Sequence, residues 1–209
     1  RITSPSTIAC KSMMDSKPRA VFRLLWRALG INRTSAMKNY IQRINQIHRD
    51  LGIPENYERD FGLPLQCEET ELVIIENDIY GRQQRLKPDA ATAWNKMKKQ
   101  ALKEGVVLSI VSAFRTVNKQ EEIIKNKLAS KQPISEILQV CAAPGYSEHH
   151  TGRALDLTST ECEPLSEVFE KTETFSWLVD NAGTYSFSLS YPKGNRAGIT
   201  YEPWHWAYN

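Results

Sequence analysis

One stretch near the middle of the chain limits the folds open to it: a strong helix pattern followed at once by an apolar, β-branched run. Lys87-Pro88 opens the helix, which spans roughly residues 88–104 and stops at Gly105. Its inner side carries Ala90, Ala93, Trp94, Met97 and Leu102. Residues 106–112 are mostly apolar and β-branched, which is typical of a buried strand. Together, residues 88–104 and 106–112 predict a helix followed directly by a buried strand.

Further elements alternate along the chain. Helices are predicted at 34–51, 118–130, 134–140, 164–171 and 174–182, with one short helix at 19–29. Strands are predicted at 71–75, 153–158, 184–190 and 199–207. Residues 55–70 read as irregular, and Gly145 to Thr151 as a loop. This mixed order predicts an α+β fold, a small antiparallel sheet with flanking helices.

The charge distribution divides the chain. The formal net charge is +3, but residues 1–50 carry ten Lys or Arg against two Asp, so the remaining 159 residues sum to −5. We therefore interpret residues 1–36 as a basic appendage, rich in Ser, Arg and Lys, and residues 37–209 as one domain. A nucleic-acid partner is not expected, because no stacking-aromatic or recognition-helix pattern accompanies the basic segment. A monomer is favoured.

The four cysteines, Cys10, Cys67, Cys141 and Cys162, are widely spaced and include no CxxC pair. They favour free thiols in a reducing compartment over a thiolate zinc site or a disulfide framework. No apolar run approaches the ~20 residues that cross a bilayer. The apolar stretch at 21–29 is broken twice by arginine, which argues against a secretory signal. A cytoplasmic location is expected, with a periplasmic or secreted one as the alternative.

Two short segments hold three of the four histidines. Residues 147–156 read Ser-Glu-His-His-Thr-Gly-Arg-Ala-Leu-Asp, and residues 202–206 read Glu-Pro-Trp-His-Trp. Together they supply two imidazoles, one carboxylate and a spare carboxylate. A hydrolytic zinc site needs three protein ligands, an open position for water and a base that is not a ligand. The two segments contain this set.

The predicted elements bring these groups within reach of one ion. His149 lies in a loop and Asp156 seven residues later on a strand, with Gly152 allowing a tight turn between them. His205 comes from a terminal strand, and the Pro203 kink can aim Glu202 at a metal-bound water. These arguments leave alternatives open, since a histidine is often only a satisfied polar residue.

Two histidines illustrate those alternatives. His150 could be the ligand in place of His149, and His48 is expected to be an ordinary residue of a helix face. Spacing alone therefore does not decide between a metal site and ordinary polar residues.

Four segments in the same order resemble one family. They are Ser112-Ala113-Phe114-Arg115-Thr116 with Gln120, Ser147-x-His149-x-x-Gly152-x-Ala154-x-Asp156, Leu189-Ser190-Tyr191-Pro192, and Glu202-x-Trp204-His205. They look like the signature of the D-alanyl-D-alanine carboxypeptidase family of metallopeptidases, which includes VanY-type enzymes and related L,D-carboxypeptidases. The resemblance covers roughly residues 40–207, and four co-linear motifs are far more specific than one.

The resemblance implies a role for each matching residue. One Zn²⁺ at the sheet face would be held by His149, Asp156 and His205, with Glu202 as general base. Arg115 would bind substrate and stabilise the charge that develops on the scissile carbonyl. The other substrate-binding residues would be Gln120, Ser147, Tyr191 and Trp204.

The implied activity is removal of a C-terminal D-alanine from peptidoglycan stem peptides or muropeptides. The pattern does not separate L,D-cleavage of a tetrapeptide from D,D-cleavage of a pentapeptide. A peptidoglycan endopeptidase and a non-catalytic zinc-binding module that recognises peptides are the alternatives. The presence of Glu202 argues against the non-catalytic one.

Overall fold

A computed structural model describes residues 33–209. The helices are α3 (Arg33–Leu51), α4 (Tyr57–Phe61), α5 (Pro88–Lys103), α6 (Val117–Ala129), α7 (Ile134–Val140) and α8 (Glu173–Asn181). Three 3₁₀ helices are η1 (Glu148–Thr151), η2 (Glu167–Lys171) and η3 (Ala182–Tyr185). The strands are β1 (Val73–Asn77), β2 (Gln83–Leu86), β3 (Ser109–Ser112), β4 (Ala154–Thr158), β5 (Phe187–Leu189) and β6 (His205–Tyr208).

The central sheet has four strands in the order β3-β4-β6-β5, and every pairing in it is antiparallel. A separate antiparallel hairpin is formed by β1 and β2. In the central sheet, Asp156 of β4 lies opposite Ser112 of β3 on one side and His205 of β6 on the other. The α+β prediction, with a small antiparallel sheet and flanking helices, is confirmed.

Two hydrophobic cores hold the elements together. The first joins the sheet to α5 and α8 through Trp94, Met97, Leu155, Leu178 and Trp206, among others. Trp94 and Met97 come from the inner side of α5 that the sequence predicted, and both have an exposed fraction of 0%. Burying such large side chains is the main stabilising contribution in a domain of this size.

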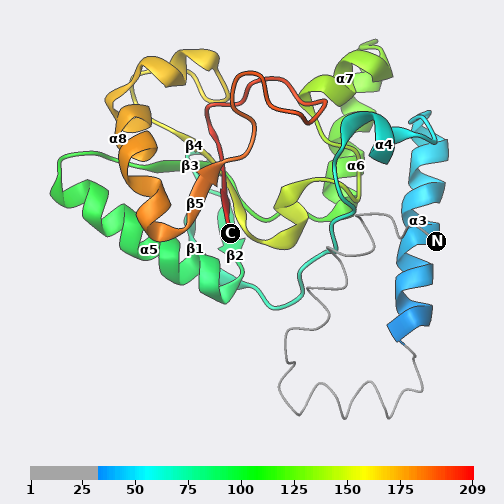
Figure 1. The fold of residues 1–209 in the computed structure, drawn as a ribbon, viewed down its shortest axis with the longest axis horizontal. Coiled ribbons are helices and arrows are strands. Elements are labelled where there is room, and N and C mark those ends of the chain that lie inside the picture. Colours follow the sequence, from blue (N-terminus) through cyan, green and yellow to red (C-terminus); the bar gives the residue numbers. More distant parts are fainter. Residues whose placement is uncertain (1–32) are drawn as a thin grey trace.

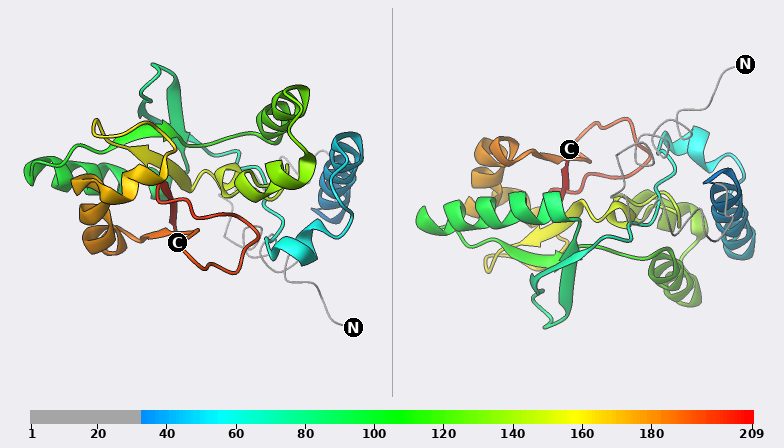
Figure 2. Two further views of the ribbon diagram at one scale, coloured as in Figure 1. Left: turned by 90° about the horizontal axis from the view of Figure 1, so that it is seen from above. Right: turned by 90° about the horizontal axis from the view of Figure 1, so that it is seen from below.

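The second core joins α3, α4, α6 and α7 to the loop before β6. Its members include Ile44, Tyr57, Ile124, Leu138 and Ile199. Figure 1 shows these four helices on one side of the molecule and α5 and α8 on the other. Both views in Figure 2 keep the same separation. The candidate site lies between the two cores, next to η1.

Most predicted elements are present with small shifts, and four elements differ from the prediction. The sequence did not predict α4, which has five residues, nor β2, whose sequence Gln-Gln-Arg-Leu has no apolar alternation. The predicted terminal strand at 199–207 is a loop that becomes a strand only at His205. The predicted helix at 164–171 is the shorter 3₁₀ helix η2. The predicted helix at 19–29 lies outside the described residues.

The free-thiol prediction is wrong at one position. Cys67 is disulfide-bonded, whereas Cys141 and Cys162 are free. Sequence spacing could not show this, because a disulfide depends on which segments the fold brings within about 6 Å. Among the helices of residues 33–209, none is both long and apolar enough to span a membrane.

Candidate metal centre and its cavity

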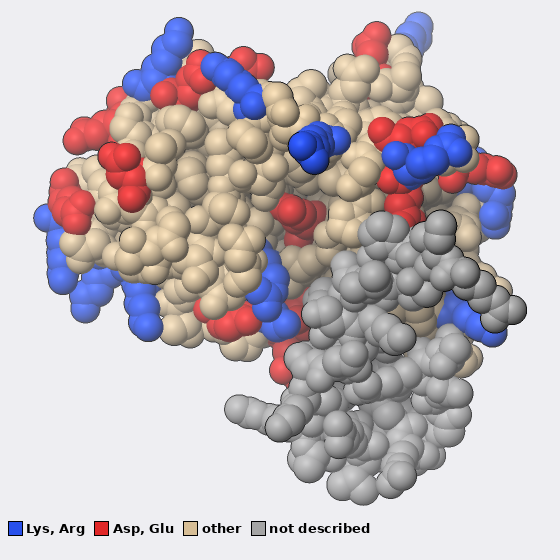
Figure 3. Space-filling model, viewed as in Figure 1, with Lys and Arg blue, Asp and Glu red and all other residues tan. Residues whose placement is uncertain are grey.

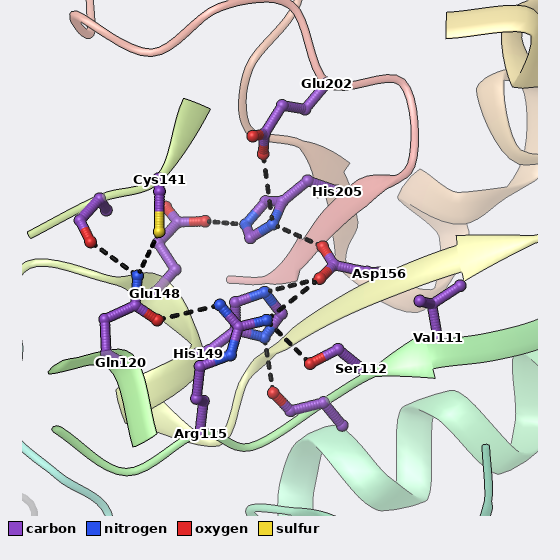
Figure 4. Close-up of polar contacts among 12 residues, drawn as sticks. Val111, Ser112, Arg115, Gln120, Cys141, Glu148, His149, Asp156, Glu202 and His205 are labelled. Carbon is purple, nitrogen blue, oxygen red and sulfur yellow. Dashed lines mark hydrogen bonds and ion pairs between the residues drawn. The ribbon is translucent and has the colours of Figure 1, made fainter. Parts of the chain in front are cut away.

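Three buried side chains converge from separate elements. His149 of η1, Asp156 of β4 and His205 of β6 each place one donor atom within 4.8 Å of the other two. Their exposed fractions are 3%, 5% and 3%. Figure 4 shows the two imidazoles on either side of the Asp156 carboxylate. The structure therefore brings together the three residues for which the sequence predicted a common site.

The backbone around Gly152 sets the spacing of this cluster. Gly152 ends η1 with φ +65°, the left-handed region that glycine adopts readily, and its N–H donates to the His149 carbonyl. A Cβ at this position would lie 2.8 Å from Leu72 Cδ2 and 3.1 Å from the Lys87 backbone nitrogen. The turn then leads directly into β4, and pairing with β6 sets Asp156 beside His205.

Each imidazole uses its two nitrogens differently. His149 directs Nε2 to Asp156 Oδ2 at 3.1 Å, while its Nδ1 lies 2.5 Å from the Ala113 carbonyl oxygen. His205 directs Nδ1 to Asp156 Oδ1 at 3.0 Å, while its Nε2 lies 2.9 Å from Glu148 Oε2. One nitrogen of each ring thus faces the cluster, and the other is held by a neighbour that fixes the ring's orientation.

The same contacts decide between the two adjacent histidines. The Nδ1 of His150 lies 2.6 Å from the Arg115 carbonyl oxygen, and its Nε2 accepts a hydrogen bond from the Gly145 N–H at 3.1 Å. Both nitrogens of His150 are therefore occupied by the backbone. The alternative that His150 is the ligand is not supported by this geometry, whereas His149 has a nitrogen directed at Asp156.

The buried carboxylate and imidazoles of the cluster stabilise one another's charged forms. Burial alone would raise the pKa of Asp156, but the two imidazoles outweigh it and hold that pKa well below its usual value. Burial would lower the pKa of His205, yet hydrogen bonds to Asp156 and Glu148 raise it to about 10. Burial lowers the pKa of His149, with Asp156 opposing. The carboxylate is thus ionised at neutral pH, as a metal ligand must be.

Glu202 lies at the edge of the cluster without joining it. Its Oε2 is 3.9 Å from His205 Nδ1, and its backbone N–H donates to the Tyr191 carbonyl. Burial raises the pKa of Glu202 to about 7, and His205 and Arg115 only partly oppose that rise. A carboxyl group with a pKa near 7 can both accept and return a proton at neutral pH.

Arg115 faces the cluster from the opposite side, directly after β3. Its Nη1 donates to Gln120 Oε1 at 3.0 Å, and its Nη2 donates to Ser112 Oγ at 2.9 Å. The same Nη2 lies 3.5 Å from Asp156 Oδ2. The amide of Gln120 is in turn anchored, because its Nε2 donates to the Ala142 carbonyl at 2.7 Å. The guanidinium is therefore held in one orientation.

A cavity of about 320 Å³ opens onto these groups. All nine residues that the sequence assigned to the site line it: Arg115, Gln120, Ser147, His149, Asp156, Tyr191, Glu202, Trp204 and His205. The centroid of the Tyr191 ring lies 4.9 Å from that of the His205 ring. In Figure 3, acidic atoms are visible in a depression near the middle of the face.

The sequence reasoning missed two partners of the cluster. Glu148 contacts His205, and Ser190 Oγ donates to Glu148 Oε2 at 2.6 Å. Glu148 stands next to His149, and Ser190 lies in the segment just before the last motif. An acidic residue beside a candidate ligand was the available signal, but only the fold shows that Glu148 serves the other histidine.

The donor set fits zinc. Two imidazole nitrogens and one carboxylate oxygen are ligands that Zn²⁺ accepts, and three protein ligands leave a fourth position for water or substrate. The rings are pre-oriented by Ala113 and Glu148, as in many metal sites. Fold and site together define an α+β protein with a buried His-Asp-His centre suited to a hydrolytic metal ion.

Residues 83–209 match the VanY family, described as D-alanyl-D-alanine carboxypeptidase. The match spans more than half of the chain and contains every residue of the centre. The chain therefore belongs to the VanY family.

Known proteins agree with this assignment. The chain is 36% identical over 167 residues to the putative carboxypeptidase YodJ of Bacillus subtilis, which covers 74% of this chain. The structure of the LdcB LD-carboxypeptidase superposes with a TM-score of 0.61 at 34% identity, covering 68% of this chain and 69% of that one. A variant of the vancomycin-resistance D,D-pentapeptidase VanY, in complex with Zn(II), superposes with a TM-score of 0.53 at 26% identity. The match covers 67% of this chain and 79% of that one.

The likeness does not extend over the whole of the curated relatives. The chain covers 60% of the length of the YodJ protein. The similar structures are described with different specificities, one L,D and one D,D. Family membership therefore leaves the substrate of this chain to be argued separately.

Proposed function

We propose that this protein is a zinc-dependent carboxypeptidase that removes a C-terminal D-alanine from peptidoglycan stem peptides. The observation that carries the proposal is the convergence of three buried donors with Glu202 and Arg115 on one cavity. One zinc ion held by His149, Asp156 and His205 would lower the pKa of a water and polarise the scissile carbonyl. The similar structures, described as LD-carboxypeptidase and D,D-pentapeptidase, support this substrate class.

Glu202 is proposed as the general base. It accepts a proton as water attacks the peptide carbonyl carbon, and it returns the proton to the departing nitrogen of D-alanine. Its pKa of about 7 suits both halves of this exchange. Its distance from His205 keeps it next to the centre while leaving its carboxyl group outside the ligand set.

Arg115 is proposed to stabilise the negative charge on the carbonyl oxygen. The guanidinium stays charged at any working pH, and Gln120 and Ser112 hold its donors before substrate arrives. Pre-oriented donors of this kind are often the largest single contribution to catalysis. Ser147 would hydrogen-bond the peptide, and Tyr191 and Trp204 would shape the cavity wall.

A location outside the cytoplasm follows from the proposal better than the predicted cytoplasmic one. Disulfides persist in oxidising compartments, and Cys67 forms one. The proposed substrate belongs to the cell wall. The disulfide and the substrate together favour the periplasmic or secreted alternative.

The test is mass analysis of synthetic stem peptides after incubation with the zinc-loaded protein. A tetrapeptide ending in one D-Ala and a pentapeptide ending in D-Ala-D-Ala are run in parallel, with Glu202→Ala as the inactive control. Loss of one alanine from the tetrapeptide alone gives L,D-specificity, and loss from the pentapeptide alone gives D,D-specificity. No cleavage of either, with zinc bound, contradicts the proposal and favours an endopeptidase or a binding module.

A further inference from the structure

The two imidazoles of the centre have different supports. The partner of His149 Nδ1 is a neutral backbone carbonyl, that of Ala113, whereas the partner of His205 Nε2 is the carboxylate of Glu148. A carboxylate is the stronger acceptor for an imidazole N–H, because the bond is charge-assisted. It also makes the opposite nitrogen a better electron donor to a metal.

Glu148 is held in place for this contact. Ser190 donates to the same oxygen, Oε2, that faces His205, so the carboxylate is fixed from a second element. The Glu148 side chain is 29% exposed, and the His205 side chain is 4% exposed. Figure 4 shows Glu148 and Asp156 on opposite sides of the His205 ring.

This position excludes Glu148 as a base in the proposed reaction. The carboxylate approaches His205 Nε2, whereas the nitrogen that faces the cluster is Nδ1. Glu148 is also not among the residues that line the cavity, while Glu202 is. The Glu148 carboxylate contacts Ser190 and the His205 nitrogen that faces away from the cluster.

We infer that Glu148, held by Ser190, is a positioning residue that fixes His205 as a metal ligand and raises the affinity of the site for zinc. It would keep the proton of His205 on Nε2, so that the Nδ1 lone pair points to the ion. This inference rests on the proposed zinc site. It adds a residue pair that acts through His205 and touches neither metal nor substrate.

The experiment measures zinc affinity of the full chain by competition with a chromophoric chelator. Removing the acceptor with Glu148→Leu is expected to weaken zinc binding about 10- to 100-fold. Glu148→Gln keeps a hydrogen-bond acceptor without the charge, so its zinc affinity should lie between those of Glu148→Leu and the wild type. Ser190→Ala should lower the zinc affinity less than Glu148→Leu does. The partial rescue by Gln separates positioning from a general loss of structure.

Glu170 offers a matched control. Its side chain is 26% exposed, pairs with Lys193 at 2.6 Å and accepts a hydrogen bond from Tyr201, but it touches no residue of the centre. Glu170→Gln should leave zinc affinity unchanged. Thermal unfolding of each metal-free variant checks that the fold persists.

Wild-type-like zinc affinity in Glu148→Leu would overturn the inference. Absence of zinc binding by the wild-type protein would instead overturn the zinc site on which the proposed function depends. The two failures are therefore distinguishable, and neither relies on measuring turnover.

A second, independent observation concerns Lys127. Residues Gln120, Ile123 and Lys127 follow one face of α6 and all line the cavity. Seven residues of helix span about 10 Å, so the Lys127 backbone lies roughly that far along the helix from Gln120. The Lys127 side chain is half-buried and forms no ion pair with any residue in the described range 33–209.

The neighbouring lysines of α6 behave differently. Lys125 pairs with Glu121 at 2.6 Å and Lys119 with Glu122 at 2.8 Å, and both lysines are exposed. A half-buried lysine lays its aliphatic stem along the protein surface and keeps its charged head in water, where the head can pair with an anionic group that enters the cavity. Lys127 is thus a cation of the cavity wall whose partner is not supplied by the described chain.

We propose that Lys127 binds a carboxylate of the stem peptide at the outer part of the cavity. This rests on the proposed function and adds a feature of the substrate, a carboxylate within reach of α6. Two carboxylates have the right chemistry: the terminal one of D-alanine, and a side-chain one on the third residue, as in diaminopimelate.

The test measures peptide binding by calorimetry to the Glu202→Ala protein, with and without Lys127→Met. The methionine keeps most of the apolar length and removes the charge. Losing one charged hydrogen bond should weaken binding about tenfold. Lys125→Met is the control, because that lysine has its own partner outside the cavity.

Two peptide pairs identify the carboxylate. If Lys127→Met weakens binding of peptides with diaminopimelate as third residue but not of those with lysine there, the side-chain carboxylate is the partner. If it weakens binding of both peptides, and amidation of the terminal carboxylate removes the difference, the terminal carboxylate is the partner. Equal affinities of the Lys127→Met and parent proteins for every peptide would overturn the proposal. Failure of the parent protein to bind any stem peptide would overturn the proposed function instead.

Discussion

One carboxyl group lies within the candidate centre and two lie beside it, and their surroundings shift their pKa values differently. Asp156 is held ionised by two imidazoles, and its pKa is well below its usual value. Burial opposes ionisation of Glu148, but hydrogen bonds from His205 and Ser190 outweigh it and lower the pKa. Glu202 lacks such donors, so burial raises its pKa to about 7. Carboxyl groups whose environments separate their pKa values are typical of acid–base sites.

His48 supplies a prediction at the same scale, away from the centre. Its Nε2 donates to the Pro144 carbonyl at 2.8 Å, and the ring packs against Tyr57 and Tyr146. Burial lowers the pKa of His48 below its usual 6.5. As the pH falls through 6.5, the unfolded chain therefore binds a proton that the folded protein does not, and the free energy of unfolding decreases.

The test compares urea unfolding of the wild type and His48→Gln between pH 7 and pH 5. Glutamine can still donate to the Pro144 carbonyl, but it does not titrate. The wild type should lose more stability on acidification than the variant, by at most about 1.4 kcal/mol per pH unit. Parallel pH profiles for the two proteins would show that His48 titrates alike in both states.

At the scale of elements, the turn at Gly152 links metal ligands to the sheet. Alanine there would adopt a left-handed backbone and also approach Leu72 and the Lys87 backbone closely. Gly194 has a similar φ of +72° with nothing within 4 Å of its Cβ position, so it isolates the backbone cost. That cost is about 1–2 kcal/mol. Overpacking at Gly152 should add roughly 1–3 kcal/mol.

Urea unfolding of Gly152→Ala and Gly194→Ala measures the difference. Gly152→Ala should be the less stable of the two, and it should also bind zinc more weakly, because the turn between His149 and Asp156 must move away from Leu72 and Lys87. Equal losses of stability in both variants would mean that the neighbours of Gly152 yield without cost.

The elements also show what the sequence can and cannot predict. Helices with a clear apolar face, such as α3 and α5, begin and end within a residue or so of their predicted limits, because burial enforces the periodicity. The hairpin strand β2 is polar and half-exposed, so it depends on pairing with β1 and leaves no pattern. The resemblance to the family implied nine site residues, and these nine share one cavity. It could not reveal Glu148 as the partner of His205, which depends on contact across 57 positions.

At the scale of the whole molecule, the centre lies where two hydrophobic cores meet. The donors come from η1, β4 and β6, and the strands belong to the core that contains α5 and α8. Gln120, which holds Arg115, comes from α6 in the other core. The cavity thus has walls from both, and Arg115 links them through its bonds to Gln120 and Ser112. Any ion at the centre would tie three separate segments of the fold together.

Metal removal should therefore lower the stability of the entire domain. A ligand that binds only the folded state at a hundred times its dissociation constant adds about 2.7 kcal/mol, which for a chain of this size corresponds to roughly 5–10 °C in melting temperature. A chelator should lower the melting temperature of the zinc-loaded wild type by that amount. Glu202→Ala should respond in the same way, since Glu202 lies outside the ligand set, and it should lack turnover. His149→Ala should show neither the response nor turnover. A chelator response in His149→Ala equal to that of the wild type would mean that the ion binds elsewhere in the chain.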